Sequence, residues 1–234
     1  MTTNNFEENF GDMQFADNPY PRCPLVMILD SSSSMFQVRE GQTQSPMESL
    51  NTGLDFLMTE LYSDPNSRRR ISVSFTVYGS EVQEPTEFAE VDNIVLPDLT
   101  QQMGTTSTGK AICTALDHLA EYKAKLDKNG IQKYRPFIIL MSDGLSTDDL
   151  TEARERIKAG DTPEAKEFSF FAVGIDGADL EQLNSLGNRQ ALPLKNDSFR
   201  EFFQWLSAST ASVSQSQPED DKISIPAPTG WTEL

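Results

Sequence analysis

One short stretch of this sequence gathers side-chain oxygens directly after an apolar run. Asp30 directly follows the apolar residues 25–29 and is itself followed by four serines, residues 31–34. Serine competes with backbone hydrogen bonding and favours caps and turns, so four in a row make a poor structural sequence. A carboxylate and hydroxyls at the carboxyl end of a buried strand lie where open α/β sheets bind ligands. We therefore predict a metal site here.

Two other segments supply oxygens of the same kind. Asp143 follows a second apolar run, and Thr106 lies in a turn that opens a predicted helix. Ser32 and Ser34 stand two and four residues after Asp30, and hydroxyls at alternate positions of a tight turn can face one point. Carboxylates, hydroxyls and waters are hard donors that suit Mg²⁺ or Mn²⁺ and not zinc or copper. The candidate ligands are Asp30, Ser32, Ser34, Thr106 and Asp143, with waters and an incoming carboxylate completing six positions.

The rest of the pattern predicts an α/β fold, a doubly wound and mostly parallel sheet flanked by helices. Short apolar runs bounded by turn formers are typical of strands buried on both faces, and strict alternation in residues 71–78 predicts a strand with one wetter face. Strands that alternate with helices indicate a parallel sheet covered on both sides. The predicted strands are residues 25–29, 71–78, 136–141, 168–175 and 191–194, and the predicted helices are residues 46–63, 106–126, 147–159, 178–186 and 198–212. In such a sheet the strands before Asp30 and Asp143 can be neighbours, which would bring both acids to one crevice.

Polar segments separate and flank the predicted strands and helices. Ser45, Pro46 and Glu48 form a capping-box signature for the first helix. The three arginines at residues 68–70 predict a solvated turn. The acidic residues 81–96 are irregular and could include one short edge strand. We expect a flexible acidic leader over residues 1–20, one α/β domain over 21–213, and a Pro-rich acidic tail over 214–234. Ile223, Ile225 and Trp231 are expected to strap that tail to the body.

Composition excludes several function classes. With 19 Lys+Arg against 36 Asp+Glu, the net charge is −17, which argues against nucleic-acid binding and against an anionic membrane surface. The N-terminus shows no secretory signal, and no apolar run approaches the length of a membrane span. Cys23 and Cys113 are therefore expected to be reduced thiols in the cytoplasm. The single histidine, His118, rules out multi-histidine zinc sites and is predicted to be a helix residue without a partner.

Three stretches carry a resemblance to a known family. They are PLVMILDSSSSM, GTTSTGKAI and FIILMSDGLSTDD, and they resemble the von Willebrand factor type A domain with its metal-ion-dependent adhesion site. The family's D-x-S-x-S motif falls on Asp30, Ser32 and Ser34, its threonine on Thr106 and its distal aspartate on Asp143. The resemblance implies that the first four contact the metal directly or through water, and that Asp143 acts through a water. It also implies a non-enzymatic module that binds a protein partner through that partner's Asp or Glu.

A finer resemblance concerns a bacterial subgroup. The phrases NPYPRCPLVMILDSSSSM, YRPFIILMSDG, FFAVGIDGADL and FREFFQWLSASTASVS are similar to TerY-like proteins, which are cytoplasmic and often encoded beside tellurite-resistance, kinase and phosphatase genes. This implies a kinase or phosphatase partner in a stress or signalling system. Two departures stand out: Ser33 replaces a glycine usual in the family, which costs the loop some conformational freedom, and Thr105 replaces another common glycine.

The main rival interpretation is a phosphate-binding loop. Residues 104–110 fit G-x-x-x-x-G-K, but Ala111 stands where the Mg²⁺-binding hydroxyl is required. The residues before Gly104 do not form an apolar strand pattern, and the serines after Asp30 would be left without a role. A P-loop-like nucleotide binder is therefore the remote alternative.

Other classes fit less well. An aspartyl-nucleophile phosphatase needs a second carboxylate where Ser32 stands, and a serine hydrolase needs a base that His118 is poorly placed to supply. The serines could also be a solvated turn, although Thr106 and Asp143 at matching element ends argue against it. One alternative stays open: a structural adaptor in which the metal only ties strand ends together.

Overall fold

The described part of the chain forms a single twisted sheet. The structure is a computed structural model and describes residues 18–143, 145–175, 178–194, 198–216, 225–228 and 232. Across these residues the sheet has six strands in the order β3-β2-β1-β4-β5-β6. Only β3 is antiparallel to its neighbour, whereas the other adjacent pairs run parallel. The strands are β1 (Cys23–Asp30), β2 (Ile71–Tyr78), β3 (Ala89–Glu90), β4 (Phe137–Ser142), β5 (Ser169–Ile175) and β6 (Leu192–Leu194).

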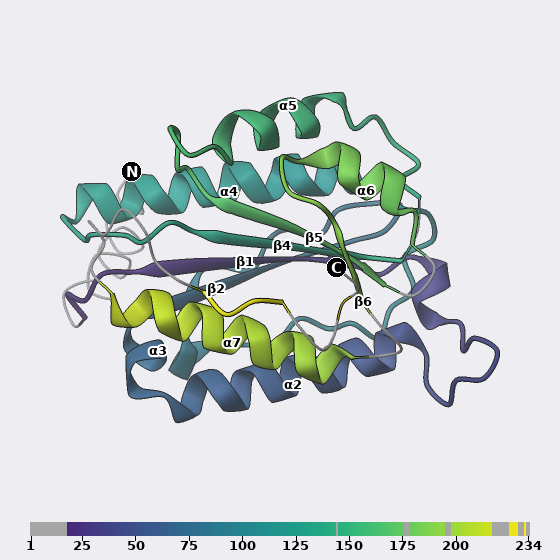
Figure 1. The fold of residues 1–234 in the computed structure, drawn as a ribbon, viewed down its shortest axis with the longest axis horizontal. Helices are drawn as coiled ribbons and strands as arrows, with labels where there is room; N and C mark the ends of the chain where they lie inside the picture. Colours follow the sequence, from purple (N-terminus) through teal and green to yellow (C-terminus); the bar gives the residue numbers. More distant parts are fainter. Residues whose placement is uncertain are drawn as a thin grey trace, which may run out of the picture.

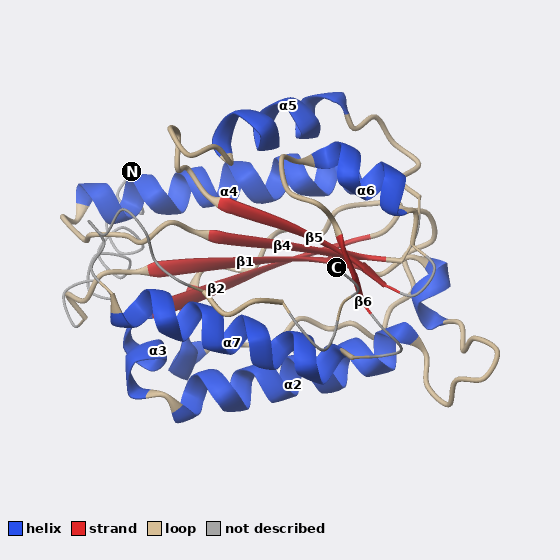
Figure 2. Cartoon of the chain, in the orientation of Figure 1, coloured by secondary structure: helices blue, strands red, loops and turns tan. Residues whose placement is uncertain are grey.

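Helices cover both faces of this sheet, as predicted (Figure 1). Figure 2 shows α2, α3 and α7 on one side and α4, α5 and α6 on the other. The helices are α2 (Pro46–Ser63), α3 (Pro65–Arg70), α4 (Thr108–Lys128), α5 (Thr151–Gly160), α6 (Leu180–Leu186) and α7 (Phe199–Gln215), with short 3₁₀ turns η1 (Ser33–Phe36) and η2 (Val91–Asn93). The α/β class and the doubly wound arrangement are thus confirmed.

The central strand β1 is buried along its whole length. Leu25, Met27 and Leu29 face the core beneath α2 and α7, whereas Val26 and Ile28 face the core beneath α4, α5 and α6. Burying a side chain of this size contributes about 1.5–3 kcal/mol. Because β1 serves both cores, its carboxyl end is fixed with respect to both helical layers.

One prediction about β2 was wrong. Its residues alternate as expected, but Ser72, Ser74 and Thr76 are fully buried and do not form a wetter face. Ser72 Oγ accepts a hydrogen bond of 2.9 Å from the Tyr122 hydroxyl on α4, and Ser74 Oγ donates one of 2.7 Å to the Thr86 carbonyl. The covering helix and loop therefore satisfy Ser72 and Ser74 in place of solvent, whereas the buried Thr76 hydroxyl has no hydrogen-bond partner among the described residues.

The arginine triplet is also not a turn. Residues 68–70 end the short helix α3, whose N-cap Asp64 accepts a hydrogen bond of 2.9 Å from the Ser67 amide. Arg68 forms an ion pair with Asp92, and Arg70 donates to the Tyr134 hydroxyl. A side-chain cap at Asp64 turns the expected solvated turn into one more helical segment.

Two helices begin later than predicted, at Thr108 instead of 106 and at Thr151 instead of 147. The Thr147 amide donates to the Thr106 carbonyl at 2.7 Å, and the Thr147 hydroxyl donates to the same oxygen at 3.0 Å. Residues 106 and 147 therefore join two loops to each other before their helices start. The capping box of Ser45 and Glu48 on α2 is confirmed.

The predictions for His118 and for the C-terminal tail can also be compared with the structure. His118 was predicted to lack a partner, but its Nε2 lies 3.0 Å from the Thr86 carbonyl and its ring stacks on Phe88. The Trp205 indole donates to the Pro226 carbonyl at 2.8 Å, Ile225 lies against the core, and Thr232 bridges to Leu194. The described part of the tail is thus strapped to the body. Ile223, Trp231 and the leader residues 1–17 lie outside the described residues.

The two thiols give a first test of this fold. Both cysteines are free; Cys23 is fully buried, and burial raises its pKa to about 12. Cys113 is partly exposed, and burial is also the main cause of its raised pKa. We expect a disulfide reagent at pH 8 to modify native Cys113 slowly and Cys23 only after unfolding, because the thiolate is the reacting form. Labelling followed by mass spectrometry measures this, with Cys113→Ser as the control. Rapid labelling of Cys23 in the native protein would contradict the packing of β1.

Candidate metal site at the strand ends

The two predicted acids lie at one edge of the sheet. β1 and β4 are adjacent and parallel, with Leu29 opposite Met141, so Asp30 at the end of β1 and Asp143 directly after β4 lie at neighbouring strand ends. β1 connects to β2 on one side and neighbours β4 on the other, which makes this edge the point where the strand order reverses. η1 and the loop after it lie at the same end of the sheet (Figure 1).

Asp30 is completely buried. Its Oδ1 accepts a hydrogen bond of 2.8 Å from the Ser32 amide, and its Oδ2 accepts one of 2.6 Å from the Ser142 hydroxyl. Ser142 was not among the predicted site residues, although its position as the last residue of an apolar strand, directly before Asp143, was a usable signal. The two bonds hold the carboxylate at the end of β1.

The serines connect Asp30 to Asp143. Ser32 Oγ lies 3.2 Å from Ser34 Oγ, and the Ser34 hydroxyl donates to Asp143 Oδ1 at 2.7 Å. Ser34 lies in η1, which starts directly after Ser32 and brings the second hydroxyl back toward β4. Four of the five predicted ligands therefore form one continuous hydrogen-bonded group.

Thr106 joins this group through its loop. The Ser33 amide donates to the Gly104 carbonyl at 2.9 Å, and the Met103 amide donates to the Ser31 carbonyl at 2.8 Å. Gly104 has φ of +75°, a conformation that favours glycine. Among the described residues, the hydrogen bonds of Thr106 itself are made by its backbone and not by its hydroxyl. The structure thus brings residues 99–106 against the serine turn of residues 31–34, through these backbone bonds and a hydrogen bond of 2.7 Å that the Ser31 hydroxyl donates to the Gln101 carbonyl.

Arg39 is a site residue that sequence reasoning missed. It belongs to the loop of residues 37–44 between η1 and α2, and its Nη2 lies 2.6 Å from Asp143 Oδ2. The Asp143 side chain is fully buried, whereas that of Arg39 is 26% exposed. Both oxygens of Asp143 are therefore engaged, one by Ser34 and the other by a cation. An irregular loop carries no periodic signal that could have identified Arg39.

Burial dominates the electrostatics of Asp30. Desolvation raises its pKa to about 6, against the lowering effect of the hydrogen bonds from Ser142 and Ser32, and the charge of Asp143 raises it slightly further. A buried carboxylate that is difficult to ionise, next to a second acid, is stabilised by any cation that reaches its oxygens. This chemistry favours binding of a positive ion.

The donor set fits a hard divalent cation. Within the described ranges, no three His, Cys, Asp or Glu side chains gather as a metal site. The candidate site has only two carboxylates, and its other donors are hydroxyls. Such an all-oxygen set suits Mg²⁺ or Mn²⁺ and lacks the nitrogen and sulfur ligands typical of zinc.

The start of α4 speaks against the phosphate-loop alternative. The Gly109 and Lys110 amides donate to the Asp148 carboxylate at 3.0 and 2.8 Å. A Cβ on Gly109 would lie 2.2 Å from the Asp149 carbonyl, so only glycine allows this close approach. The amides that would bind a phosphate are thus occupied by an aspartate of the chain, and residues 99–103 are not a strand.

Comparisons with known proteins agree with this architecture. The family model of the von Willebrand factor type A domain matches residues 24–207. No curated protein matches the chain.

Among the described residues, no helix has both the length and the apolar character needed to cross a bilayer.

Solved structures with the same fold include a matrix protein, a pilus adhesin and a minor pilin. Proximal thread matrix protein 1 from the mussel byssus has a TM-score of 0.54 at 15% identity, over 83% of this chain and 49% of that one. The pilus adhesin SpaC from Lactobacillus rhamnosus GG has a TM-score of 0.56 at 13% identity, over 81% and 31%. The PilB minor pilin from Streptococcus sanguinis has a TM-score of 0.52 at 12% identity, over 80% and 61%. The chain therefore spans less than two thirds of each neighbour, and at these identities the likeness concerns the fold alone.

The raised pKa of Asp30 predicts an unusual pH dependence of metal-free stability. The folded pKa of about 6 lies above the unfolded value near 3.9. The stabilising effect of protonation is therefore complete below about pH 4 and lost as pH rises through 6. Asp30→Asn removes this loss, so in EDTA it should gain about 2–3 kcal/mol relative to the unmodified chain between pH 4 and pH 8.

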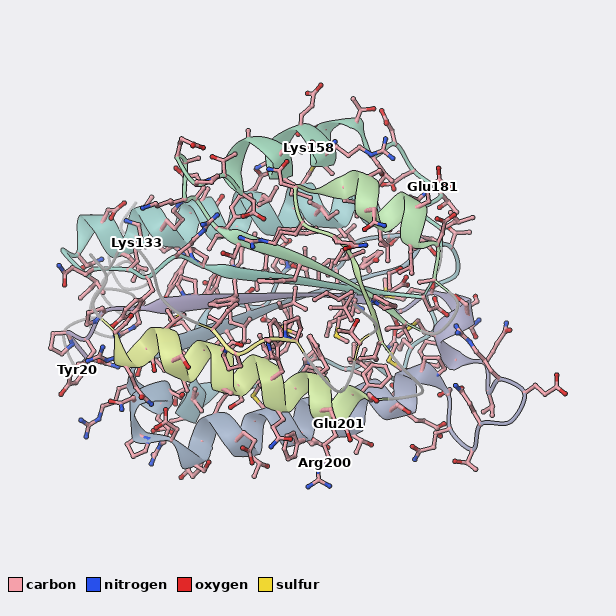
Figure 3. All side chains as sticks on the ribbon, viewed as in Figure 1. Tyr20, Lys133, Lys158, Glu181, Arg200 and Glu201 are labelled. Atoms are coloured by element: carbon pink, nitrogen blue, oxygen red, sulfur yellow. The ribbon has the colours of Figure 1, made fainter. Side chains whose placement is uncertain are left out.

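Urea unfolding at both pH values measures that gain. Glu181→Gln is the matched control, because Glu181 is exposed on α6 (Figure 3). It should leave the pH dependence unchanged. Parallel pH profiles for Asp30→Asn and the unmodified chain would show that the Asp30 carboxylate is not desolvated in solution.

Proposed function

The chain belongs to the von Willebrand factor type A domain family, and from this premise we propose that it is a protein-binding module that depends on a divalent cation. The observation that carries the proposal is the hydrogen-bonded group of Asp30, Ser32, Ser34 and Asp143 at the switch point of the sheet. It combines two acids with neutral hydroxyls at the edge where α/β sheets bind ligands. We propose no enzymatic role.

Each residue has a distinct part in this proposal. Asp30 would be the charged ligand, and the hydroxyls of Ser32, Ser34 and Thr106 would be neutral ligands. Asp143 would stay one step removed, because Ser34 and Arg39 already engage its two oxygens. This leaves little negative charge in direct contact with the ion position, so a further anionic group is favoured there.

The partner chemistry follows from that charge balance. A bound Mg²⁺ or Mn²⁺ supplies a hard, under-neutralised charge that attracts an Asp or Glu side chain of a partner protein. The net charge of −17 repels an acidic partner at long range. Physiological salt screens that repulsion beyond about 8 Å, so the local cation dominates at contact. One solved neighbour, the mussel byssus matrix protein, has been described with a zinc-occupied MIDAS motif.

The proposed biological setting rests on the sequence resemblance and on the state of the cysteines. A kinase or phosphatase partner in a TerY-like stress or signalling system is supported by the sequence resemblance alone. A cytoplasmic location is supported by the two free cysteines, Cys23 and Cys113, because paired cysteines are characteristic of oxidising compartments.

A structural adaptor is the second candidate function. Hydrogen bonds already tie the loop of residues 99–106 to the serine turn at one point and to Thr147 at another. A cation could add to these ties without contacting any partner. The two candidates differ in whether partner binding requires the ion.

Removal of the Asp30 carboxylate tests metal binding directly. We expect Asp30→Ala to lose Mg²⁺ affinity at least a hundredfold by calorimetry, because the only charged ligand in direct contact is gone. Far-UV circular dichroism should stay native, since the variant removes a buried charge. Asp55→Ala, which removes an exposed carboxylate from α2, is the matched control. Unchanged Mg²⁺ affinity in Asp30→Ala would refute the proposed site.

Capture experiments separate the binder from the adaptor. For a metal-bridged binder, proteins retained from source lysate in Mg²⁺ should be released by EDTA, and Asp143→Ala should retain much less of them. The physical reason is that the ion is part of the interface. Retention of the same proteins in chelator and by Asp143→Ala would instead identify the adaptor.

A further inference from the structure

A cation of the chain already contacts the candidate site. Arg39 Nη2 lies 2.6 Å from Asp143 Oδ2, and the other oxygen of the same carboxylate accepts from Ser34 at 2.7 Å. Ser34 is also one of the proposed metal ligands. The guanidinium and the proposed ion position are therefore separated by one carboxylate and one hydroxyl.

The burial of this pair makes the charge of Arg39 effective. The Asp143 side chain is inaccessible to solvent, and Arg39 contacts it from a loop with 26% of its own side chain exposed. Charges interact more strongly where solvent is excluded, and salt screens partly buried pairs much less than exposed ones. A fixed positive charge at this distance must act on any ion that binds to Asp30 and the serines.

We propose that Arg39 sets the two affinities of the site in opposite directions. It weakens binding of the divalent cation, by repulsion and by holding Asp143, and it strengthens binding of the partner's carboxylate, by attraction. The proposal rests on the proposed function and adds the residue that determines how strongly the site favours an acidic group. As a consequence, the cation alone binds weakly, and the cation together with a carboxylate binds well.

The sign of the effect distinguishes this role from simple positioning. If Arg39 only fixed the orientation of Asp143, its loss would weaken the cation site, and carboxylate binding would weaken with it. If Arg39 acts by its charge, its loss strengthens cation binding and weakens carboxylate binding. The sign of the change in cation affinity therefore separates the two roles.

The test uses Mn²⁺ as the cation and acetate as the carboxylate, with the full chain. Free Mn²⁺ is measured by electron paramagnetic resonance, and relaxation of the acetate methyl protons reports acetate at the bound ion. We expect Arg39→Gln to bind Mn²⁺ about tenfold more tightly and to bind acetate several-fold more weakly. Arg39→Ala should repeat both changes, and Arg39→Lys, which keeps the charge, should stay close to the unmodified chain.

Controls separate the possible failures. Lys158→Gln removes one positive charge from the exposed side of α5 (Figure 3) and should leave both affinities unchanged. Mn²⁺ binding that is equal or weaker in Arg39→Gln and Arg39→Ala would overturn the role of Arg39 while leaving the metal site intact. No Mn²⁺ binding by the unmodified chain would overturn the proposed function and this inference together.

Discussion

Desolvation of the Asp30 carboxylate is the constraint that the surrounding structure has to satisfy. An acid placed at the end of a strand buried between two helical layers loses its hydration, and its pKa rises to about 6. The Ser32 amide and the Ser142 hydroxyl replace part of that hydration. Both of these donors are neutral, so a bound cation would supply the charge that balances the ionised carboxylate.

The same constraint explains why the site is assembled from several loops. A residue on β1 alone could not surround Asp30 with oxygens, since successive side chains of a strand point to opposite faces. The serine turn, the Gly104 loop and the residues after β4 meet only because β1 and β4 are adjacent and parallel. Both hydrophobic cores keep β1 and β4 side by side. The positions of the oxygens of the candidate site therefore depend on packing along the full length of the sheet.

Much of this arrangement could be predicted from the sequence because its signals are local. Apolar runs identified β1, β4 and β5, and the spacing of Asp30, Ser32 and Ser34 pointed to one turn. The features that were missed depend on partners distant in sequence. Ser72, Ser74 and Thr76 look like a wet face until α4 and the Thr86 loop cover them, and Arg39 contacts Asp143 across 104 residues. Periodicity carries no information about such pairs.

Asp148 shows how the fold separates two functions that short motifs confuse. Residues 104–110 have the glycines and the lysine of a phosphate loop, and a helix N-terminus with free amides attracts anions. Here the Asp148 carboxylate occupies the Gly109 and Lys110 amides and holds the start of α4 against the loop after β4. An aspartate that caps this helix repels phosphate and leaves the Thr106 loop beside the serine turn. The anion-binding capacity of α4 is thus used internally, while the carboxylates of Asp30 and Asp143 provide the opposite preference, for a cation, at the same edge of the sheet.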